Sequence, residues 1–140
     1  MTVSLIQSES EHLASRQIRE EVFVVEQQVP PEIEYDEYEE SSTHILASLD
    51  GVLVGTARWR KTENGQKLER FAVLKSARGK GVGEALVKFV LDQIDDTDPA
   101  YLNSQVSAIP FYARMGFEAK GEIFYEAGIP HRKMVLKRIK

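Results

Sequence analysis

A run of alternating glycines, Arg78-Gly-Lys-Gly-Val-Gly83, joins an apolar segment to a long amphipathic one. The preceding segment, Leu68-Glu-Arg-Phe-Ala-Val73, has the composition of a strand, and apolar residues recur at helical spacing after the run. Backbone N–H groups at the start of a helix lack partners, and glycines let an anion approach them closely. Arg78 and Lys80 add full positive charges. The run therefore predicts a phosphate or pyrophosphate site; the alternative is a tight turn with solvated basic residues.

Two common nucleotide-binding motifs do not fit this run. A Walker loop requires Gly-x-x-x-x-Gly-Lys-Ser/Thr, and the sequence contains no such string. The dinucleotide fingerprint requires a third glycine three positions after the second, and that position is Glu84 when counted from Gly79 and Gly81. A different phosphate-bearing ligand is therefore expected.

The segments before the run predict one helix and several strands. Residues 2–7 alternate as a strand does, and Ser8 with Glu11 forms a capping box. The helix that follows presents apolar residues on one face, namely Ala14, Ile18, Val22 and Val25. Strands are expected at 43–49 and 52–60, joined by an Asp50-Gly51 turn, and at 67–74 after Asn64-Gly65.

The segments after the run complete the order β-α-β-β-β-α-β-α-β-β. The amphipathic helix begins at Val82, and a strand at 101–106 leads to a helix that Ser107 caps and Gly116 ends. Two last strands flank Ala127-Gly-Ile-Pro130. The central strand–loop–helix–strand unit requires a parallel pair and the hairpins require antiparallel pairs. The fold class is therefore α/β (α+β), with a mixed sheet of about six to seven strands flanked by helices.

Composition excludes several classes of protein. With 140 residues, 42% hydrophobic and 29% charged, the chain fits one domain spanning residues 1–140. The net charge of −4 argues against binding nucleic acid. The absence of cysteine excludes thiolate metal sites, and the three histidines have none of the usual metal-ligand spacings, so no metal is expected. No apolar stretch approaches the roughly 20 residues of a membrane span, and residues 1–7 lack signal-peptide features, so a cytoplasmic location is expected.

Three elements in order resemble the GNAT acyl-CoA N-acyltransferases. Arg78-x-x-Gly81-x-Gly83 is similar to the pyrophosphate loop of that family, and residues 68–73 resemble its fourth strand. Phe111-Tyr-Ala-Arg-Met-Gly-Phe117 resembles its later Phe-Tyr-x-x-x-Gly-Phe segment. The resemblance covers nearly the whole chain and implies a sheet that splays between strands 4 and 5.

A narrower likeness is to the small bacterial YjcF/ElaA-like branch. It is carried by Val22-Phe-Val-Val-Glu-Gln27 before Val29-Pro30, by Leu102-Asn-Ser-Gln105 and by Gly128-Ile-Pro-His131. Acceptors in that branch are poorly defined, so this likeness does not specify the substrate.

The family resemblance implies that acetyl-CoA is the acyl donor and that an amine attacks it directly in a ternary complex. The pyrophosphate would lie on the main chain of six residues, Arg78, Gly79, Lys80, Gly81, Val82 and Gly83. The pantetheine arm would lie along Phe71, Ala72 and Val73 as an added strand. Asn103 and Gln105 are expected to face the same side, where they bind pantetheine or acceptor or remain buried amides.

The same resemblance makes Tyr112 the general acid that protonates the departing thiolate. The general base stays open among Glu26, Glu69, His44 and a water chain. His131 is expected to be a structural turn histidine. The acidic run Glu32–Glu40 is read as a solvated face, with attraction of a cationic amine as the alternative.

The expected activity is acetyl-CoA-dependent N-acetylation of a primary amine on a small molecule or peptide. One alternative is a module that binds or senses acyl-CoA without turnover, and another is a transferase of longer acyl chains. No partner nucleic acid or membrane is expected. Dimers are common in the family, and a homodimer stays open.

Overall fold

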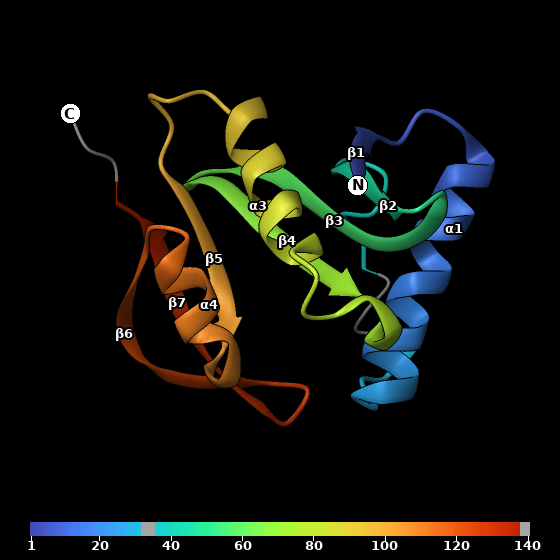
Figure 1. Ribbon diagram of the computed structural model, residues 1–140. Coiled ribbons are helices and arrows are strands. Elements are labelled where there is room, and N and C mark those ends of the chain that lie inside the picture. Colours follow the sequence, from blue (N-terminus) through green and yellow to red (C-terminus); the bar gives the residue numbers. More distant parts are fainter. Residues whose placement is uncertain (32–35, 138–140) are drawn as a thin grey trace.

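The computed structural model describes residues 1–31 and 36–137. The strands within them are β1 (Thr2–Leu5), β2 (Thr43–Leu49), β3 (Val52–Thr62), β4 (Gly65–Val73), β5 (Ala100–Gln105), β6 (Phe117–Glu126) and β7 (Ile129–Leu136). These seven form one sheet in the order β1-β2-β3-β4-β5-β7-β6 (Figure 1). Only the β4–β5 pair is parallel among them, which confirms the mixed sheet.

The helices are α1 (Glu9–Arg19), the π-helix η1 (Glu20–Glu26), the 3-10 turns η2 (Lys75–Ala77) and η3 (Val106–Ala108), α3 (Val82–Gln93) and α4 (Ile109–Arg114). Within the described residues, none of these is long and apolar enough to cross a membrane. Figure 1 shows α1 at the opposite end of the molecule from β6 and β7, with α3 between them.

The two faces of the sheet bury different helices because side chains alternate along a strand. On β2, Ile45 and Ala47 lie in the main core, which also contains the buried face of α3. The intervening Leu46 lies in a smaller core with Ile18 and Val22. Helices α1 and α3 therefore cover opposite faces of the same strands.

The predicted capping box is present at the start of α1. The Ser8 hydroxyl accepts a hydrogen bond from the N–H of Glu11 at 3.2 Å, and the Glu11 carboxylate accepts one from the N–H of Gln7 at 2.9 Å. The first bond satisfies a donor that the helix leaves unpaired, and the second satisfies the N–H of the residue before the N-cap.

The prediction that Val25 shares the apolar face of this helix is wrong. Val22 is buried, but Val25 is 60% exposed. The chain continues α1 as the π-helix η1, in which the N–H of Gln27 bonds to the carbonyl of Val22 at 3.2 Å. This i→i+5 bonding widens the turn, so residues at α-helical spacing no longer lie on one face.

The prediction that Ser107 caps the next helix is also wrong. Ser107 lies inside η3, and the N-cap of α4 is Ala108, which makes no side-chain hydrogen bond. Pro110 occupies the first turn of α4, where its missing N–H costs nothing. The helix α4 is thus preceded by a 3-10 turn and has no side-chain cap.

Candidate active site

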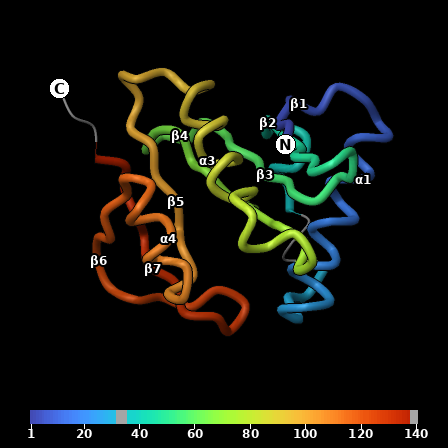
Figure 2. Tube along the Cα trace, in the orientation of Figure 1, coloured from blue at the N-terminus to red at the C-terminus, as the bar shows by residue number. Residues whose placement is uncertain are grey.

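Strands β4 and β5 separate after three pairs. Their register joins Gln66 to Ala100, Lys67 to Tyr101 and Leu68 to Leu102, and it ends there. The two traces run together at first and then diverge (Figure 2). From Glu69 to Val73, β4 has no described strand beside it on the β5 side, so part of its backbone edge is open. An open edge of this kind can pair with an extended ligand.

A β-bulge marks the point of separation. On β3, the register moves by two residues between Thr56 and Arg58, while on β4 it moves by three, between Glu69 and Ala72. Arg70 lies within the extra stretch with a φ of 61°, in the left-handed region that favours glycine. Such bulges bend a strand and change the direction of its side chains.

A cavity of about 260 Å³ occupies the gap between the strands. Its walls come from β4, β5, α4, the end of the first helix and the β6–β7 turn. The polar side chains that line it include Gln27, Glu69, Asn103, Gln105, Tyr112 and His131. Asn103 and Gln105 therefore face one site, as predicted.

Tyr112 lies in this cavity within a group of aromatic rings. Its ring meets those of Phe71, Phe111 and Phe117 edge-to-face, at centroid distances of 6.0, 4.9 and 6.1 Å. Burial raises the pKa of its hydroxyl well above the usual value. At neutral pH the group therefore carries its proton and can donate it.

The glycine run forms an open turn into α3. Gly79 and Gly81 have φ values of 78° and 83°, and a side chain at Gly79 would meet nothing within 4 Å. Gly81 is the N-cap of α3 and has no side chain to bond the first N–H groups. The turn therefore presents free N–H groups at the positive end of the helix dipole.

Glu26 lies outside the cavity. Its two oxygens accept hydrogen bonds from Arg78 at 2.5 and 2.7 Å, and these bonds hold the pKa of the carboxyl below its usual value. Arg78 also donates through Nε to the carbonyl of Val73 at 3.0 Å. The structure thus joins Glu26 to the glycine run and separates it from Tyr112 and Glu69.

Glu69 lines the cavity but is bound by several cations. Its Oε1 lies 2.9 Å from Arg58 and 2.8 Å from Arg60, and its Oε2 lies 3.5 Å from Lys67. Burial acts to raise the pKa of Glu69, but these cations outweigh it and hold the pKa below its usual value. Glu69 is therefore a weaker base than an ordinary glutamate.

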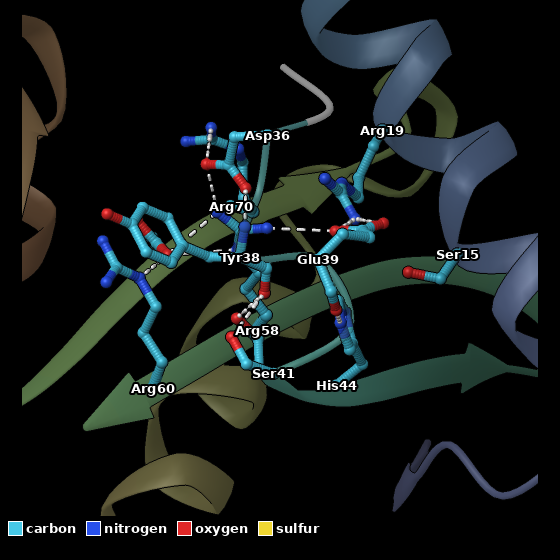
Figure 3. Close-up of polar contacts among 12 residues, drawn as sticks. Ser15, Arg19, Asp36, Tyr38, Glu39, Ser41, His44, Arg58, Arg60 and Arg70 are labelled. Carbon is cyan, nitrogen blue, oxygen red and sulfur yellow. Dashed lines mark hydrogen bonds and ion pairs between the residues drawn. The ribbon is translucent and has the colours of Figure 1, made fainter. Parts of the chain in front are cut away.

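The acidic run is more than a solvated face, which corrects that prediction for the residues described. Asp36 accepts a bond from the fully buried Arg58 at 2.7 Å. Glu39 accepts bonds from the buried Arg19 at 2.6 Å and from Arg58 at 3.0 Å (Figure 3). Two arginines without solvent contact require such partners, which explains the density of carboxylates. Residues 32–35 of the run lie outside the described residues.

Two of the histidines come together beside this network, which their spacing in the sequence did not indicate. The rings of His12 and His44 meet edge-to-face at 4.9 Å, and donor atoms of His12, His44 and Glu39 lie within 4.8 Å of one another. His44 Nε2 donates to the carbonyl of Glu39 at 2.7 Å. Burial lowers the pKa of His44, which therefore resists protonation. This histidine lies apart from the cavity residues.

The end of the first helix contributes to the cavity through residues that were not predicted. Phe23, Gln27 and Val29 line the cavity, and the side chain of Gln27 accepts a bond from Gln105 at 2.8 Å. Phe23 lies in the π-helix, Gln27 is its C-cap and Val29 follows it. The local sequence does not predict that these residues line the cavity, because nothing in their residue types indicates a π-helix.

A model of the acetyltransferase (GNAT) domain matches residues 7–138. An uncharacterised N-acetyltransferase, YjcF of Bacillus subtilis, is 44% identical over 121 residues, which are 84% of this chain and 86% of that protein.

Solved structures agree with this match. A crystal structure of an acyl-CoA N-acyltransferase from Pseudomonas aeruginosa has a TM-score of 0.86 at 29% identity, covering 98% of this chain and all of that one. Escherichia coli ElaA has a TM-score of 0.84 at 29% identity, covering 97% of this chain and 100% of its own.

Proposed function

Because the chain belongs to the GNAT acetyltransferase family, we propose that it transfers the acetyl group of acetyl-CoA directly to a primary amine. The acceptor is a small molecule or a peptide amine, and both substrates are bound at once. The observation that carries this proposal is the open edge of β4, from Glu69 to Val73, next to a glycine turn with free N–H groups. Residues 1–140 would act as one N-acetyltransferase domain.

The donor would bind along β4 and the turn. The backbone of Phe71, Ala72 and Val73 would pair with the amides of pantetheine. The N–H groups of residues 79–83 and the charge of Lys80 would hold the pyrophosphate, and Asn103 would bond the arm from β5. An N–H of β4, that of Val73 in our proposal, would stabilise the oxygen of the thioester as it gains charge.

Tyr112 would be the general acid. Its aromatic neighbours fix the ring, and its raised pKa keeps the hydroxyl protonated. A raised pKa also makes the hydroxyl a weaker acid. Its contribution to the rate is therefore expected at the low end of the range for acid catalysis. Glu26 and Glu69 stay candidate bases, but the cations bound to each oppose that role.

The test is calorimetric titration of the protein with acetyl-CoA, with dephospho-CoA and ATP as controls. We expect micromolar binding that Gly81→Asp abolishes, because a side chain blocks approach to the turn and a carboxylate repels phosphate. Gly121→Asp is the matched control. Gly121 has a similar φ of 77° and open space around it, but it lies on β6.

Three outcomes would change the proposal. If a folded sample does not bind acetyl-CoA, the transferase and the sensing module are both wrong. If it binds but releases CoA at the same rate with and without amines, the sensing module is favoured. If a longer acyl-CoA binds more tightly than acetyl-CoA, a transferase of longer acyl chains is favoured. A cytoplasmic location and a homodimer stay predictions.

A further inference from the structure

His131 occupies a defined place in the wall of the cavity. It is the third residue of β7, paired with Gln105 of β5 on one side and with Phe124 of β6 on the other. It is only 8% exposed, and it lines the same cavity as Tyr112 and Asn103.

The hydrogen bond of His131 fixes its tautomer. Its Nδ1 lies 2.7 Å from the carbonyl oxygen of Ile129. A carbonyl can only accept, so Nδ1 carries a proton. In the neutral ring, Nε2 therefore has a free lone pair. The ring also stacks on Phe124 with a centroid distance of 5.9 Å and an angle of 23°, which holds its plane.

A carboxylate stands near the free nitrogen. Glu126 Oε2 lies 3.9 Å from His131 Nε2, which is too far for a direct hydrogen bond but close enough to stabilise a positive charge on the ring. Charged side chains from two strands line the cavity, namely Lys67, Glu69 and Arg70 of β4 and Glu126 of β6. Among the described residues, Glu126 is the only one of these in an ion pair with His131.

We infer that His131 is the general base of the transfer, accepting a proton from the acceptor ammonium at Nε2. This rests on the proposed function. Unlike Glu26 and Glu69, it has no arginine or lysine bound to it in the described structure. Glu126 is a positioning residue that stabilises the imidazolium.

The proton balance of this step is complete. The ammonium loses one proton to His131, which passes it to solvent. The amine lone pair then forms the C–N bond at the thioester carbon, and the C–S bond breaks. The thiolate takes a proton from Tyr112, and the proton that the new amide nitrogen loses restores Tyr112. One proton is released in total, as the reaction requires.

The decisive variant is His131→Asn. The asparagine amide can still donate to the carbonyl of Ile129, so the turn is kept while the base is lost. Two probe amines are compared at neutral pH: butylamine, which is protonated, and trifluoroethylamine, which is largely neutral. We expect kcat/KM to fall about a hundredfold for butylamine but no more than roughly threefold for trifluoroethylamine. Acetyl-CoA affinity should not change.

Two further variants complete the design. Glu126→Gln should lower kcat/KM for butylamine more than for trifluoroethylamine, because the carboxylate 3.9 Å from Nε2 no longer faces the protonated ring. His12→Asn makes the same substitution outside the cavity, and its activity should equal that of the wild type. If His131→Asn lowers kcat/KM by the same factor for both amines, the inference is overturned.

Nitrogen-15 NMR of the histidine rings tests the inference without any acceptor. The protein has three histidines, and the His131→Asn variant identifies the signal. We expect the Nδ1–H tautomer for His131, and an Nε2–H tautomer would overturn the inference. Loss of acetyl-CoA binding in the wild type would instead overturn the proposed function, so the two failures are distinguishable.

Discussion

Arg78 binds both oxygens of Glu26, 52 residues earlier in the chain, while its Nε donates to the carbonyl of Val73. One guanidinium thus joins the end of η1, the end of β4 and the start of the glycine run. The guanidinium of Arg78 is therefore already bonded to Glu26 at the place where a pyrophosphate would bind. Phosphate and the Glu26 carboxylate would therefore compete for the same cation.

This competition predicts the effect of Glu26→Gln. Removing the carboxylate charge frees Arg78 for phosphate, so acetyl-CoA should bind more tightly. The pair is partly exposed, and pairs of this kind contribute up to about 1 kcal/mol, so the gain should be no more than roughly fivefold. Calorimetric titration with acetyl-CoA measures it.

Glu21→Gln is the matched control, because Glu21 is an exposed glutamate on the same π-helix. Its affinity for acetyl-CoA should equal that of the wild type. A different result for Glu26→Gln, namely unchanged affinity with kcat more than about tenfold lower, would make Glu26 the base.

Tyr112→Phe should lower kcat about 10- to 100-fold and leave acetyl-CoA affinity unchanged. The ring contacts survive the substitution, so only the proton donor is lost. Steady-state kinetics and calorimetry on the same preparation separate the two effects. Tyr125→Phe deletes a hydroxyl from a 70% exposed ring on β6 and should change neither quantity. An unchanged kcat for Tyr112→Phe would remove Tyr112 from the mechanism.

His44 predicts a pH dependence of stability. Burial lowers its folded-state pKa, so the unfolded chain binds this proton more readily. Its contribution is complete above the unfolded pKa of about 6.5 and declines as pH falls towards the folded value. The slope is at most about 1.4 kcal/mol per pH unit. Urea unfolding of the wild type at about ten pH values between pH 7 and pH 5 measures this slope.

His44→Gln should flatten this slope, because glutamine keeps an N–H for the carbonyl of Glu39 and does not titrate. His12→Gln is the control: it removes only the smaller contribution of His12 to the lowered pKa of His44, so most of the wild-type slope should remain. Asp36, Glu39 and Glu69 have lowered pKa values, so their contribution is lost only below about pH 4, as pH falls through those values. Equal slopes for wild type and His44→Gln would contradict this account.

Local patterns in the sequence predicted the order of the elements well. Alternation, the Asp50-Gly51 turn and the capping box at Ser8 depend on neighbours in the chain, and the structure confirms each. The family resemblance added the splay between β4 and β5, which β-propensity does not indicate because the separated part of β4 reads as an ordinary strand.

Features that depend on tertiary contacts were missed. The π-helix turns Val25 outward without a local signal, since its apolar spacing suits an α-helix. The acidic run looked like surface because its partners, Arg19 and Arg58, lie far away in the sequence. The place of His131 in the cavity wall was also missed, because it follows from the pairing of β7 with β5 and β6.

The short contact between β4 and β5 also has a consequence for how the chain folds and responds to heat. The sheet consists of an N-terminal part, β1 to β4, and a C-terminal part, β5 to β7, joined by three residue pairs. Few backbone bonds therefore oppose their separation, and the apolar core shared by α3 and both parts carries most of the cohesion. A molecule that bonds to both strands would raise the melting temperature in proportion to the logarithm of its concentration, by mass action.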